Sequence, residues 1–384
     1  MSRDLGDARK NKNDEFYTVY EYIQKEINAY IEYNPDTFKD KVVLLPCDDP
    51  EWSNFTKFFA QNFEMLGLKK LISTSYATDS KNKSGYQYSI EDFLTSYEIN
   101  SPQYDKTKAS AKGKIFILER DINESGKRDI EDLEWSYLEG DGDFRSDEVK
   151  KLRDEADIIV TNPPFSQFRE FVAWIMEAQK KFLIIGSQNA ITYKEIFPLI
   201  RMNELWLGAT CNSEDMVFRV PEGAEVNPKD REKAAKLGFV GNYTRLGNAN
   251  WFTNIEHGRR HQELSLMTMA DNLKFSKHRD LLETGYLSYD NFDAIEVSYL
   301  DAIPSDYDGV MGVPITFISK YCPEQFEILG FGAGELGVAA GVRPYDRTLK
   351  PLSSALRDGI PYIYNKEKNI VTVPYARIFI RKKV

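Results

Sequence analysis

The residues best suited to chemistry are Asn162, Pro163, Pro164 and Phe165, which directly follow a short apolar run at residues 158–161. That run has the composition of a buried strand in a parallel sheet. Neither proline can donate a backbone N–H, and each keeps the residue before it extended, so the strand must end there. Asn162 is therefore expected at the carboxyl end of a strand, where open α/β sheets bind their ligands.

Asn162 and Pro163 together offer two fixed acceptors, a side-chain oxygen and a backbone carbonyl. An exocyclic amine is a poor nucleophile because its lone pair is delocalised into the ring. Two acceptors that bind its two N–H groups favour the pyramidal geometry in which the lone pair can attack, and Phe165 would stack on the flat base. The alternative is structural: the prolines end a strand and Phe165 is a core residue.

The composition sets broad limits on the protein. A chain of 384 residues is long enough for a catalytic domain and a smaller second domain. It has no apolar run of membrane length and no leader pattern, so an intracellular, cytoplasmic protein is expected. The three cysteines are far apart and only three histidines are present, so no zinc spacing is found and no metal site is expected.

The net charge of −10 argues mildly against a nucleic-acid partner, but the charges are unevenly distributed. Arg9, Lys10 and Lys12 form a basic arm ahead of the first expected helix. Residues 343–383 carry ten Lys or Arg against three Asp or Glu. An acidic average with basic ends is compatible with a DNA-binding surface.

Alternating strands and helices position the Asn162 segment. A helix is expected to open at residues 14–18, and a strand at 41–45 is followed by a helix from Ser53 to Gly67 and a strand at 70–74. This spacing predicts a βαβ unit with parallel strands and a right-handed crossover. Ser166 is expected to cap the helix that follows Asn162.

Later segments predict a change of architecture. Residues 182–186 read as another buried strand, and residues 216–220 and 249–253 read as an antiparallel pair. Beyond about residue 256 the alternation stops and glycine-punctuated, irregular sequence follows. We therefore expect a catalytic domain at residues 1–255 and a second region at residues 256–384.

An amine that accepts a methyl group needs a donor, whose site should lie at the carboxyl ends of neighbouring strands. Asp48 and Asp49 follow the first strand and suit an ammonium group or ribose hydroxyls. Asp143 could accept from an adenine amino group, with Phe144 against the ring. Tyr17 and Thr18 could close over the methionine end of the donor. The alternative for each is an ordinary loop or cap residue.

Taken together and in order, these motifs resemble the EcoRI-type adenine-specific DNA methyltransferases. The segments that carry the resemblance are 14–18, 47–50, 53–55, 140–146, 161–166, 181–185, 191–195, 307–317 and 374–377. The resemblance implies an S-adenosyl-L-methionine-dependent enzyme that methylates the N6 amine of an adenine at a defined site in duplex DNA. Because that amine is paired and stacked in the duplex, the adenine is expected to flip out to reach Asn162. The resemblance also implies a Rossmann-like, mostly parallel sheet with a terminal antiparallel strand, and a smaller irregular C-terminal region for target recognition.

The resemblance places further residues and partners. Pro46 and Cys47 join the cofactor loop. A bacterial or phage-encoded cytoplasmic enzyme is implied, expected to act as a monomer and either solitary or functionally paired with a restriction endonuclease. Two departures stand out: Cys47-Asp48-Asp49 replaces the usual Gly-x-Gly, and residues 73–75 lack the customary ribose-binding acid. The ribose ligand is therefore left open between Asp48 and Asp49.

Candidate DNA contacts are the arm residues Arg9, Lys10 and Lys12, together with Arg259, Arg260 and Arg377. Because about half or more of protein–DNA hydrogen bonds go to phosphate and sugar, each arginine is expected to contact phosphate or to be an ordinary surface residue rather than to read bases. The recognition sequence is not assigned by these residues, and the resemblance suggests only a GAATTC-like site. The alternative functions are methylation of rRNA guanine N2 or a protein glutamine, and a non-catalytic DNA-binding protein.

Overall fold

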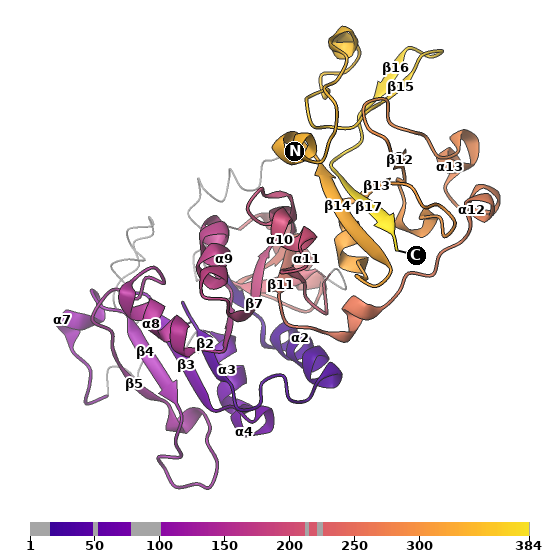
Figure 1. Cartoon of the computed structure of the whole chain (residues 1–384). Coiled ribbons are helices and arrows are strands. Elements are labelled where there is room, and N and C mark those ends of the chain that lie inside the picture. Colours follow the sequence, from indigo (N-terminus) through magenta and orange to yellow (C-terminus); the bar gives the residue numbers. More distant parts are fainter. Residues whose placement is uncertain (1–15, 49–52, 78–100, 212–214, 221–225, 384) are drawn as a thin grey trace. The chain divides into compact units, whose positions relative to one another are not determined.

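The structure is a computed structural model that describes residues 16–48, 53–77, 101–211, 215–220 and 226–383 (Figure 1). The chain divides into two compact units. The first unit comprises Met1–Gln188 and Leu207–His257, and the second comprises Asn189–Trp206 and Gly258–Val384. The sequence places a boundary near residue 256 but gives no sign that Asn189–Trp206 packs with the later part of the chain.

An eight-stranded sheet has the strand order β5-β4-β3-β2-β6-β7-β11-β8. Its strands are β2 (Val42–Leu45), β3 (Lys70–Ser75), β4 (Lys114–Leu118), β5 (Glu134–Tyr137), β6 (Ile158–Thr161), β7 (Lys181–Ser187), β8 (Trp206–Leu207) and β11 (Ala249–Thr253). The predicted βαβ unit is confirmed, because β2 and β3 are parallel neighbours. Parallel pairing continues through β6 and β7, which gives a mixed α/β architecture.

Antiparallel strands flank this parallel centre on both sides, whereas the sequence predicts one terminal antiparallel strand. β4 pairs antiparallel with β3 and with β5, and β11 pairs antiparallel with β7. A parallel neighbour needs a long crossover, usually helical. The connection from β4 to β5 contains only the short 3-10 helix η2 (Ile130–Asp132), so the chain returns as an antiparallel neighbour.

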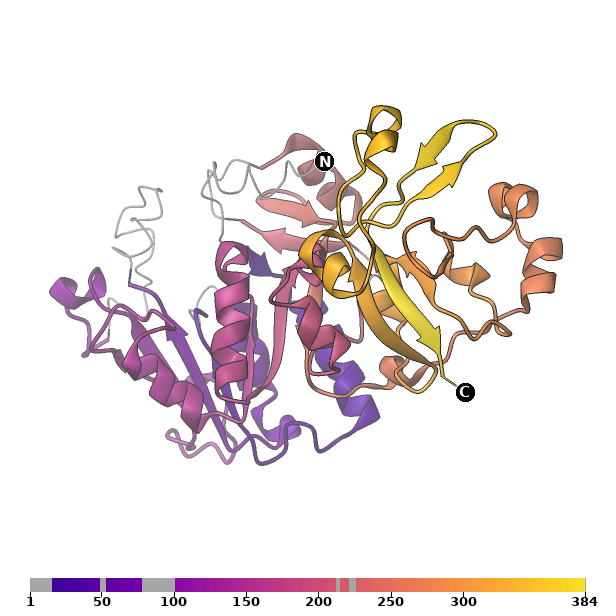
Figure 2. The ribbon, with the colours of Figure 1, turned by 45° about the horizontal axis from the view of Figure 1, so that its top comes forward.

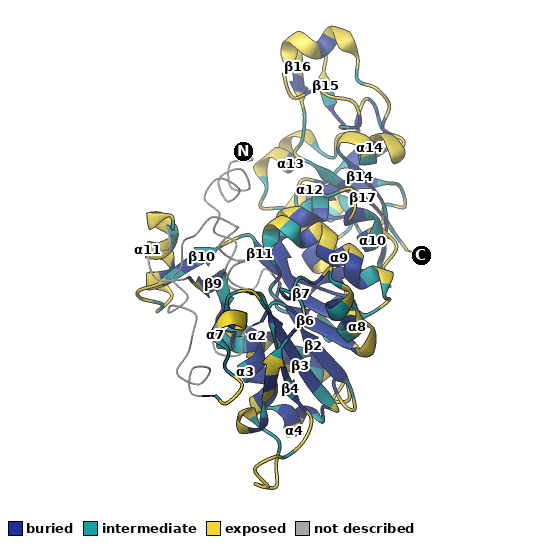
Figure 3. Ribbon diagram, turned by 90° about the vertical axis from the view of Figure 1, so that its left-hand side faces the viewer, coloured by how far each residue is buried: buried dark blue, intermediate teal, exposed yellow. Residues whose placement is uncertain are grey.

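Helices cover both faces of the sheet. Figure 3 shows α2 (Tyr20–Tyr33) and α3 (Asn54–Gln61) on one side, and α8 (Asp147–Glu155) and α9 (Phe168–Glu177) on the other. The residues of β2, β6 and β7 that share a core with α2 and α3 are Val43, Leu45, Ile158, Val160, Leu183 and Ile185. Their alternation follows from the two-residue period of a strand. On the other face, Phe168 of α9 packs against Phe252 of β11, with ring centroids 5.0 Å apart.

The helix predicted from Ser53 to Gly67 has the expected ends but is not continuous. The helix after Ser53 begins as expected, with the Ser53 hydroxyl accepting from the Phe55 N–H, and Gly67 ends it with φ +63°. It is interrupted at Asn62, however, which separates α3 from α4 (Phe63–Leu66). The Asn62 amide donates to the Phe58 carbonyl at 2.8 Å, and asparagine competes with the helix in this way.

The predicted cap at Ser166 is wrong. Residues Phe165–Gln167 form the 3-10 helix η3, and α9 starts only at Phe168. The residue at the cap position of α9 is Gln167, which makes no side-chain cap hydrogen bond. The turn imposed by the two prolines continues as a tight helix, which moves Ser166 away from the capping position.

The predictions for the first helix and the later strand pair also need correction. Tyr17–Thr18 forms strand β1, and α2 begins only at Tyr20. β1 pairs with β9 (Met216–Arg219), which pairs with β10 (Tyr243–Leu246), so β9 does not pair with β11. All five residues of β11 are buried, which suits a strand inside the large sheet better than one in a hairpin.

The second unit contains a four-stranded sheet with the order β12-β13-β17-β14 and a separate two-stranded hairpin, β15-β16. The strands are β12 (Ile295–Glu296), β13 (Met311–Pro314), β14 (Phe326–Gly332), β15 (Ile363–Asn365), β16 (Ile370–Thr372) and β17 (Arg377–Lys382). Figure 2 shows β15-β16 projecting from the sheet that contains β14 and β17. Phe197 of α10 (Phe197–Arg201) packs on Phe331 of β14 at 5.1 Å, which joins Asn189–Trp206 to this unit.

The remaining helices are short. They are α7 (Lys106–Ala109) and α11 (Pro228–Lys236) in the first unit, and α12 (Met269–Phe275), α13 (Arg279–Thr284) and α14 (Gly334–Ala339) in the second. Within the described ranges, no helix has the length and apolar character needed to cross a membrane.

Candidate active site

Asn162 lies where the sequence predicts it, directly after the buried strand β6. The preceding residue ties this strand end to the neighbouring one. The Thr161 hydroxyl is 2.7 Å from the Pro46 carbonyl and 2.6 Å from Asp48 Oδ2. The carboxyl ends of β2 and β6 are therefore held together immediately beside Asn162.

The Asn162 side-chain amide is hydrogen-bonded through its nitrogen, while its oxygen has no partner among the described residues. Its Nδ2 donates to the backbone carbonyl of Phe16 at 2.5 Å. Its Oδ1 is buried and has no hydrogen-bond partner among the described residues. A buried acceptor without a partner costs about 1–3 kcal/mol, which a bound donor would recover. The orientation follows from the contact, because only the NH2 group can face a carbonyl.

Phe165 is half-buried and lies beside Phe16, which in turn contacts Phe218. Its ring centroid lies 5.9 Å from that of Phe16, with an interplanar angle of 34°, and Phe16 meets Phe218 edge-on at 5.9 Å. We call Phe16, Phe165 and Phe218 the aromatic cluster. Pro163 is buried and Pro164 half-buried. Phe16 was not predicted as a site residue, although it stands in the 14–18 motif that carries the family resemblance.

Two residues predicted to bind the cofactor, Tyr17 and Thr18, directly follow Phe16, whose carbonyl bonds Asn162. Tyr17 is half-buried and Thr18 is buried, both in β1. The Thr18 carbonyl accepts from Asn54 Nδ2 at 2.8 Å, while the Thr18 hydroxyl is buried without a partner in the described part of the chain. Thr18 therefore offers a free hydroxyl close to the Asn162 segment.

The loop after β2 is built around Asp48, which is buried. Asp48 Oδ1 accepts from the Ser53 hydroxyl and Oδ2 lies within bonding distance of Thr161, both at 2.6 Å. The carboxylate thus joins β2, β6 and the start of α3. Asp49, its neighbour, lies outside the described residues.

Cys47 has the backbone conformation that the usual glycine of this loop would adopt. Its φ is +68°, in the left-handed region that glycine adopts most easily. The backbone therefore keeps the conformation of a glycine loop although the sequence has Cys47 there. Pro46 is buried and Cys47 is half-buried.

Asp143 and Phe144 have partners within the first unit. Both Asp143 oxygens accept from Arg145, with Oδ2 to Nη2 at 2.6 Å. Burial alone would raise the pKa of Asp143, but the hydrogen bonds and charge of Arg145 outweigh it and lower that pKa. Phe144 is buried, with its ring against Phe171 at 5.1 Å and Trp174 at 5.6 Å. The ring of Phe144 thus packs in the core beneath α9.

Tyr76 is a residue that the sequence reasoning missed. Burial, with smaller contributions from Cys47 and Asp143, raises the pKa of its hydroxyl, which also has a hydrogen bond from the Phe144 backbone. Tyr76 therefore lies where the loops after β2 and β3 meet the Asp143 loop. An aromatic residue directly after a strand end, at the position lacking the customary acid, was the available signal.

Gly142 allows the Asp143 loop to approach the end of β3. Its φ is +83°, and a Cβ at this position would overlap the carbonyl oxygen of Ser75. The hydroxyls of Thr74 and Ser75 are buried there without partners in the part that the structure describes. This edge of the sheet therefore gathers several unpaired polar atoms.

The arginines predicted to contact DNA have other partners. Arg260 is buried, with its guanidinium 3.7 Å from the centroid of the Trp206 ring. Arg377 donates to Glu296, with Nη2 to Oε1 at 2.7 Å, and both side chains are largely buried. Arg259 is half-buried. Arg9, Lys10 and Lys12 lie outside the described residues.

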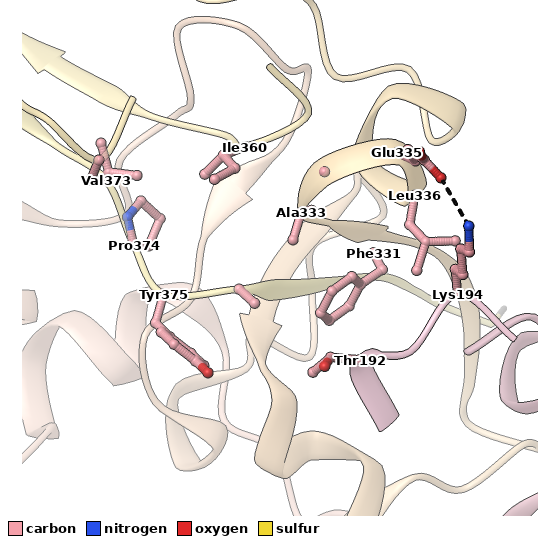
Figure 4. A pocket seen from close by; sticks show the side chains of 14 residues that line it. Thr192, Lys194, Phe331, Ala333, Glu335, Leu336, Ile360, Val373, Pro374 and Tyr375 are labelled. Carbon is pink, nitrogen blue, oxygen red and sulfur yellow. Dashed lines mark ion pairs between the residues drawn. The ribbon is translucent and has the colours of Figure 1, made fainter. Parts of the chain in front are cut away.

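A separate hollow of about 800 Å³ lies within the second unit. Its wall is largely apolar, with Phe331, Leu336 and Ile360, and Lys194 and Glu335 approach to 3.9 Å at one side (Figure 4). None of the predicted site residues lines it. In the described residues, no group of three or more His, Cys, Asp or Glu is arranged to hold a metal ion.

Comparison with known proteins gives a consistent result. Residues 4–383 match the family described as adenine-specific methyltransferase EcoRI. The chain is 41% identical over 331 residues to the type II methyltransferase M.EcoRI of Escherichia coli, covering 86% of this chain and 89% of that protein. It is 34% identical over 323 residues to the type II methyltransferase M.MpnI of Mycoplasma pneumoniae, covering 84% and 83%. No solved structure matches the chain.

Proposed function

The chain belongs to the adenine-specific methyltransferase EcoRI family, and from that premise we propose that it transfers a methyl group from S-adenosyl-L-methionine to N6 of an adenine in duplex DNA. The observation that carries this proposal is the buried, unpartnered Oδ1 of Asn162 at the end of β6. An acceptor fixed in this way suits an amine that must be oriented before it can react.

Asn162 and Pro163 bind the two N–H groups of the target amine. Asn162 Oδ1 accepts one hydrogen and the Pro163 carbonyl accepts the other, which frees the nitrogen lone pair for attack. Phe165 stacks on the adenine ring. The chemistry rests on positioning and on electrostatic stabilisation of the charge that develops on N6.

The topology of the large sheet supports a Rossmann-like cofactor site. β2 continues to β3 on one side, while β6 continues to β7 on the other, so the strand order reverses between β2 and β6. Open α/β sheets bind ligands in the crevice at such a switch point. Asp48 and Asn162 directly follow the two strands that flank it.

S-adenosyl-L-methionine, when bound, supplies an electrophilic methyl group on its sulfonium. Thr18, Thr74 and Ser75 have buried hydroxyls without partners among the described residues, which fits a polar ligand at this edge. We assign the methionine end to Tyr17 and Thr18, and the adenine to Asp143. The ribose is assigned to Asp48 or Asp49, with Pro46 and Cys47 forming the wall; each Asp48 oxygen has one hydroxyl partner and keeps a lone pair.

The target adenine must leave the duplex to reach Asn162. A paired adenine has its amine occupied and stacked, so flipping costs a few kcal/mol. Stacking on Phe165 contributes about 1–3 kcal/mol per base and offsets much of that cost. We expect 2-aminopurine at the target position to fluoresce more strongly with the wild-type protein than with Phe165→Ala, while Phe165→Trp keeps much of the signal.

The second unit is proposed to recognise the target sequence, with a monomer acting on one strand at a time. The relatives are named type II methyltransferases, and we propose a cytoplasmic role for this chain in restriction and modification, with a cognate endonuclease as a functional partner. The exposed lysines Lys366 and Lys368 at the turn of β15-β16 are candidates for phosphate contacts.

Incubation with tritiated S-adenosyl-L-methionine and duplex DNA, rRNA or protein tests the function. We expect label in DNA only, recovered as N6-methyladenine after digestion to nucleosides, and little label with Asn162→Ala. Label in rRNA guanine or in protein glutamine would replace this proposal with one of the alternatives. Sequencing of the labelled DNA for methylated positions identifies the recognition site.

A further inference from the structure

We propose that the backbone carbonyl of Phe16 is a positioning group for methyl transfer, because it holds the Asn162 amide with Oδ1 toward the target amine. The inference rests on the proposed function of Asn162. Its basis is the pair of observations on one side chain: Nδ2 donates to Phe16 O at 2.5 Å, and Oδ1 is buried without a partner in the described residues.

A side-chain amide needs such a partner because its two ends are similar in size and opposite in hydrogen bonding. Oxygen accepts, whereas the NH2 group donates twice. An amide turned by 180° would present two N–H groups to the N–H groups of the adenine amine, and neither could accept. The Phe16 carbonyl forbids that orientation, because it would then face Asn162 Oδ1 and two acceptors would meet.

The carbonyl is itself held from several directions. The Phe16 ring packs against Phe165 and Phe218 in the aromatic cluster. The next two residues, Tyr17 and Thr18, pair with Arg219 and Phe218 of β9. Asn54 Nδ2 donates to the Thr18 carbonyl at 2.8 Å. The segment therefore presents Phe16 O at a fixed place and is not an adaptable loop.

Asn162→Asp distinguishes this arrangement from a simple acceptor. An ionised Asp has no hydrogen to give the Phe16 carbonyl, so repulsion between oxygens turns the side chain away and raises its pKa. A protonated Asp donates its O–H to Phe16 O and still offers a carbonyl oxygen to the amine. If Asn162 needed only an acceptor, the ionised form would serve better than the protonated one.

The sign of the pH dependence therefore decides the question. We expect single-turnover methylation by Asn162→Asp, divided by the wild-type rate at each pH, to rise at least about tenfold as pH falls from 8 to 5.5. This change corresponds to the net worth of about one hydrogen bond. A relative rate that is flat, or that rises with pH, would overturn the role of Phe16.

Asn54→Asp is the matched control. It makes the same amide-to-carboxyl change at another hydrogen bond between an Asn side chain and a backbone carbonyl, the bond from Asn54 to Thr18 O. Thr18 is two residues after Phe16, and the acceptor on Asn162 is not altered. The control reports how general loosening of this segment changes the rate with pH. We expect its relative rate to lack the rise toward low pH, and an equal rise in both variants would overturn the proposal.

A second measurement does not depend on methylation. Because the folded pKa of the carboxyl group introduced by Asn162→Asp is raised, its stabilising effect is complete below the unfolded pKa and is lost as pH rises through the folded value. Thermal unfolding should therefore show Asn162→Asp losing stability relative to wild type as pH rises. If the stability trend is found but the wild-type protein does not methylate DNA, the proposed function is rejected and the Phe16 contact is kept. If the wild-type protein methylates DNA but the stability trend is absent, the Phe16 contact is rejected and the proposed function is kept.

An amide-to-ester change between Phe16 and Tyr17 tests the carbonyl directly in the full chain. An ester carbonyl is a weaker acceptor, and the Phe16 ring remains in place. We expect turnover to fall several-fold with the Kd for S-adenosyl-L-methionine unchanged, and the same ester between Val19 and Tyr20 to have no such effect. Equal loss in both esters would assign the effect to the backbone change itself.

Discussion

We expect Asn162 to contribute to turnover and not to cofactor binding, because in the proposed mechanism its unpartnered Oδ1 accepts from the target amine. We predict that Asn162→Ala lowers turnover by about a hundredfold or more, the usual cost of one preorganised polar group. Calorimetry should find the cofactor affinity nearly intact. Asn62→Ala is the matched control, since it also removes an Asn-to-carbonyl bond, at the break between α3 and α4. Near-wild-type turnover in Asn162→Ala would contradict the mechanism.

Asp143 is predicted to bind the cofactor through its carboxylate although Arg145 occupies both oxygens. Oδ1 accepts from both the backbone N–H and the Nε–H of Arg145, whereas Oδ2 accepts only from Nη2. Oδ2 therefore has a further lone pair that can accept from an adenine amino group. We predict that Asp143→Ala raises the Kd for S-adenosyl-L-methionine by about tenfold or more, the scale of a hydrogen bond to a charged group. Arg145→Ala should raise it less.

An equal loss of cofactor affinity in Asp143→Ala and Arg145→Ala would instead mean that the Asp143–Arg145 pair stabilises the loop and that Asp143 does not bind the cofactor itself. The comparison is informative because Arg145 also contacts Glu170 at 3.2 Å and therefore has a role of its own in the loop. Calorimetry on both variants gives the two affinities directly.

At the residue scale, sequence reasoning succeeded where chemistry limits the choice. The place of Asn162 at the end of a strand was predictable because two prolines after a buried apolar run must end that strand. Phe16 was not, because a backbone carbonyl has no sequence signature. Phe144 could not be assigned to the core, since a phenylalanine beside an acid reads the same whether it packs inward or faces a ligand.

At the element scale, Glu26 joins α2 to the loop after β8. It is buried, with Oε1 accepting from the Ala209 N–H at 2.7 Å and Oε2 from the Thr210 N–H at 2.8 Å. Burial raises the pKa of Glu26, and the hydrogen bonds from Thr210 and Ala209 offset part of this rise. The loop's backbone donors therefore depend on one side chain from a distant helix.

We predict that Glu26→Ala destabilises the protein at every pH, because unpaired buried N–H groups cost about 1–3 kcal/mol each. Because the pKa of Glu26 is raised in the folded state, its titration contributes the full stabilisation below the unfolded pKa of about 4.3. This contribution becomes smaller as pH rises through the folded pKa. The difference in melting temperature between wild type and Glu26→Ala should thus narrow from pH 5 to pH 8. Glu21→Ala, on the exposed side of α2, is the control, and a widening difference would contradict the assignment.

Element prediction failed where pairing depends on distant residues. Strand β9 has an apolar pattern that fits any partner, and only tertiary structure selects β1 and β10 over β11. The break at Asn62 could have been anticipated from asparagine's tendency to bond backward. The central strands were predictable because their continuous apolar runs have few alternatives.

At the scale of the whole molecule, the chain leaves the first unit and returns to it. Asn189–Trp206 packs with the second unit, where Phe197 contacts Phe331, and Leu207–His257 then completes the first. Composition could not reveal this crossing, because the segment's own sequence resembles an ordinary helix of an α/β domain. Covalent links at both ends of that segment tie the two units together.

The charge distribution leads to the last prediction. The protein has a net charge of −10, so DNA affinity must come from local positive groups. Arg260 and Arg377 have internal partners, so the arm and Arg259 remain of the candidate DNA contacts that the sequence predicts. Lys12 stands four residues before Phe16 in the sequence, and the Phe16 carbonyl accepts from Asn162.

We predict that replacing Arg9, Lys10 and Lys12 together with alanine weakens DNA binding and flattens its dependence on salt without changing the methylated sequence. Each phosphate contact contributes about 0.9 to the slope of log affinity against log salt, so three contacts would remove up to about 2.7. The control replaces Lys39, Lys69 and Lys180, which lie near the amino ends of β2, β3 and β7, at the edge of the sheet opposite Asn162. Both variants change the net charge equally. An equal slope in the two would mean that net charge, and not the arm, sets the affinity.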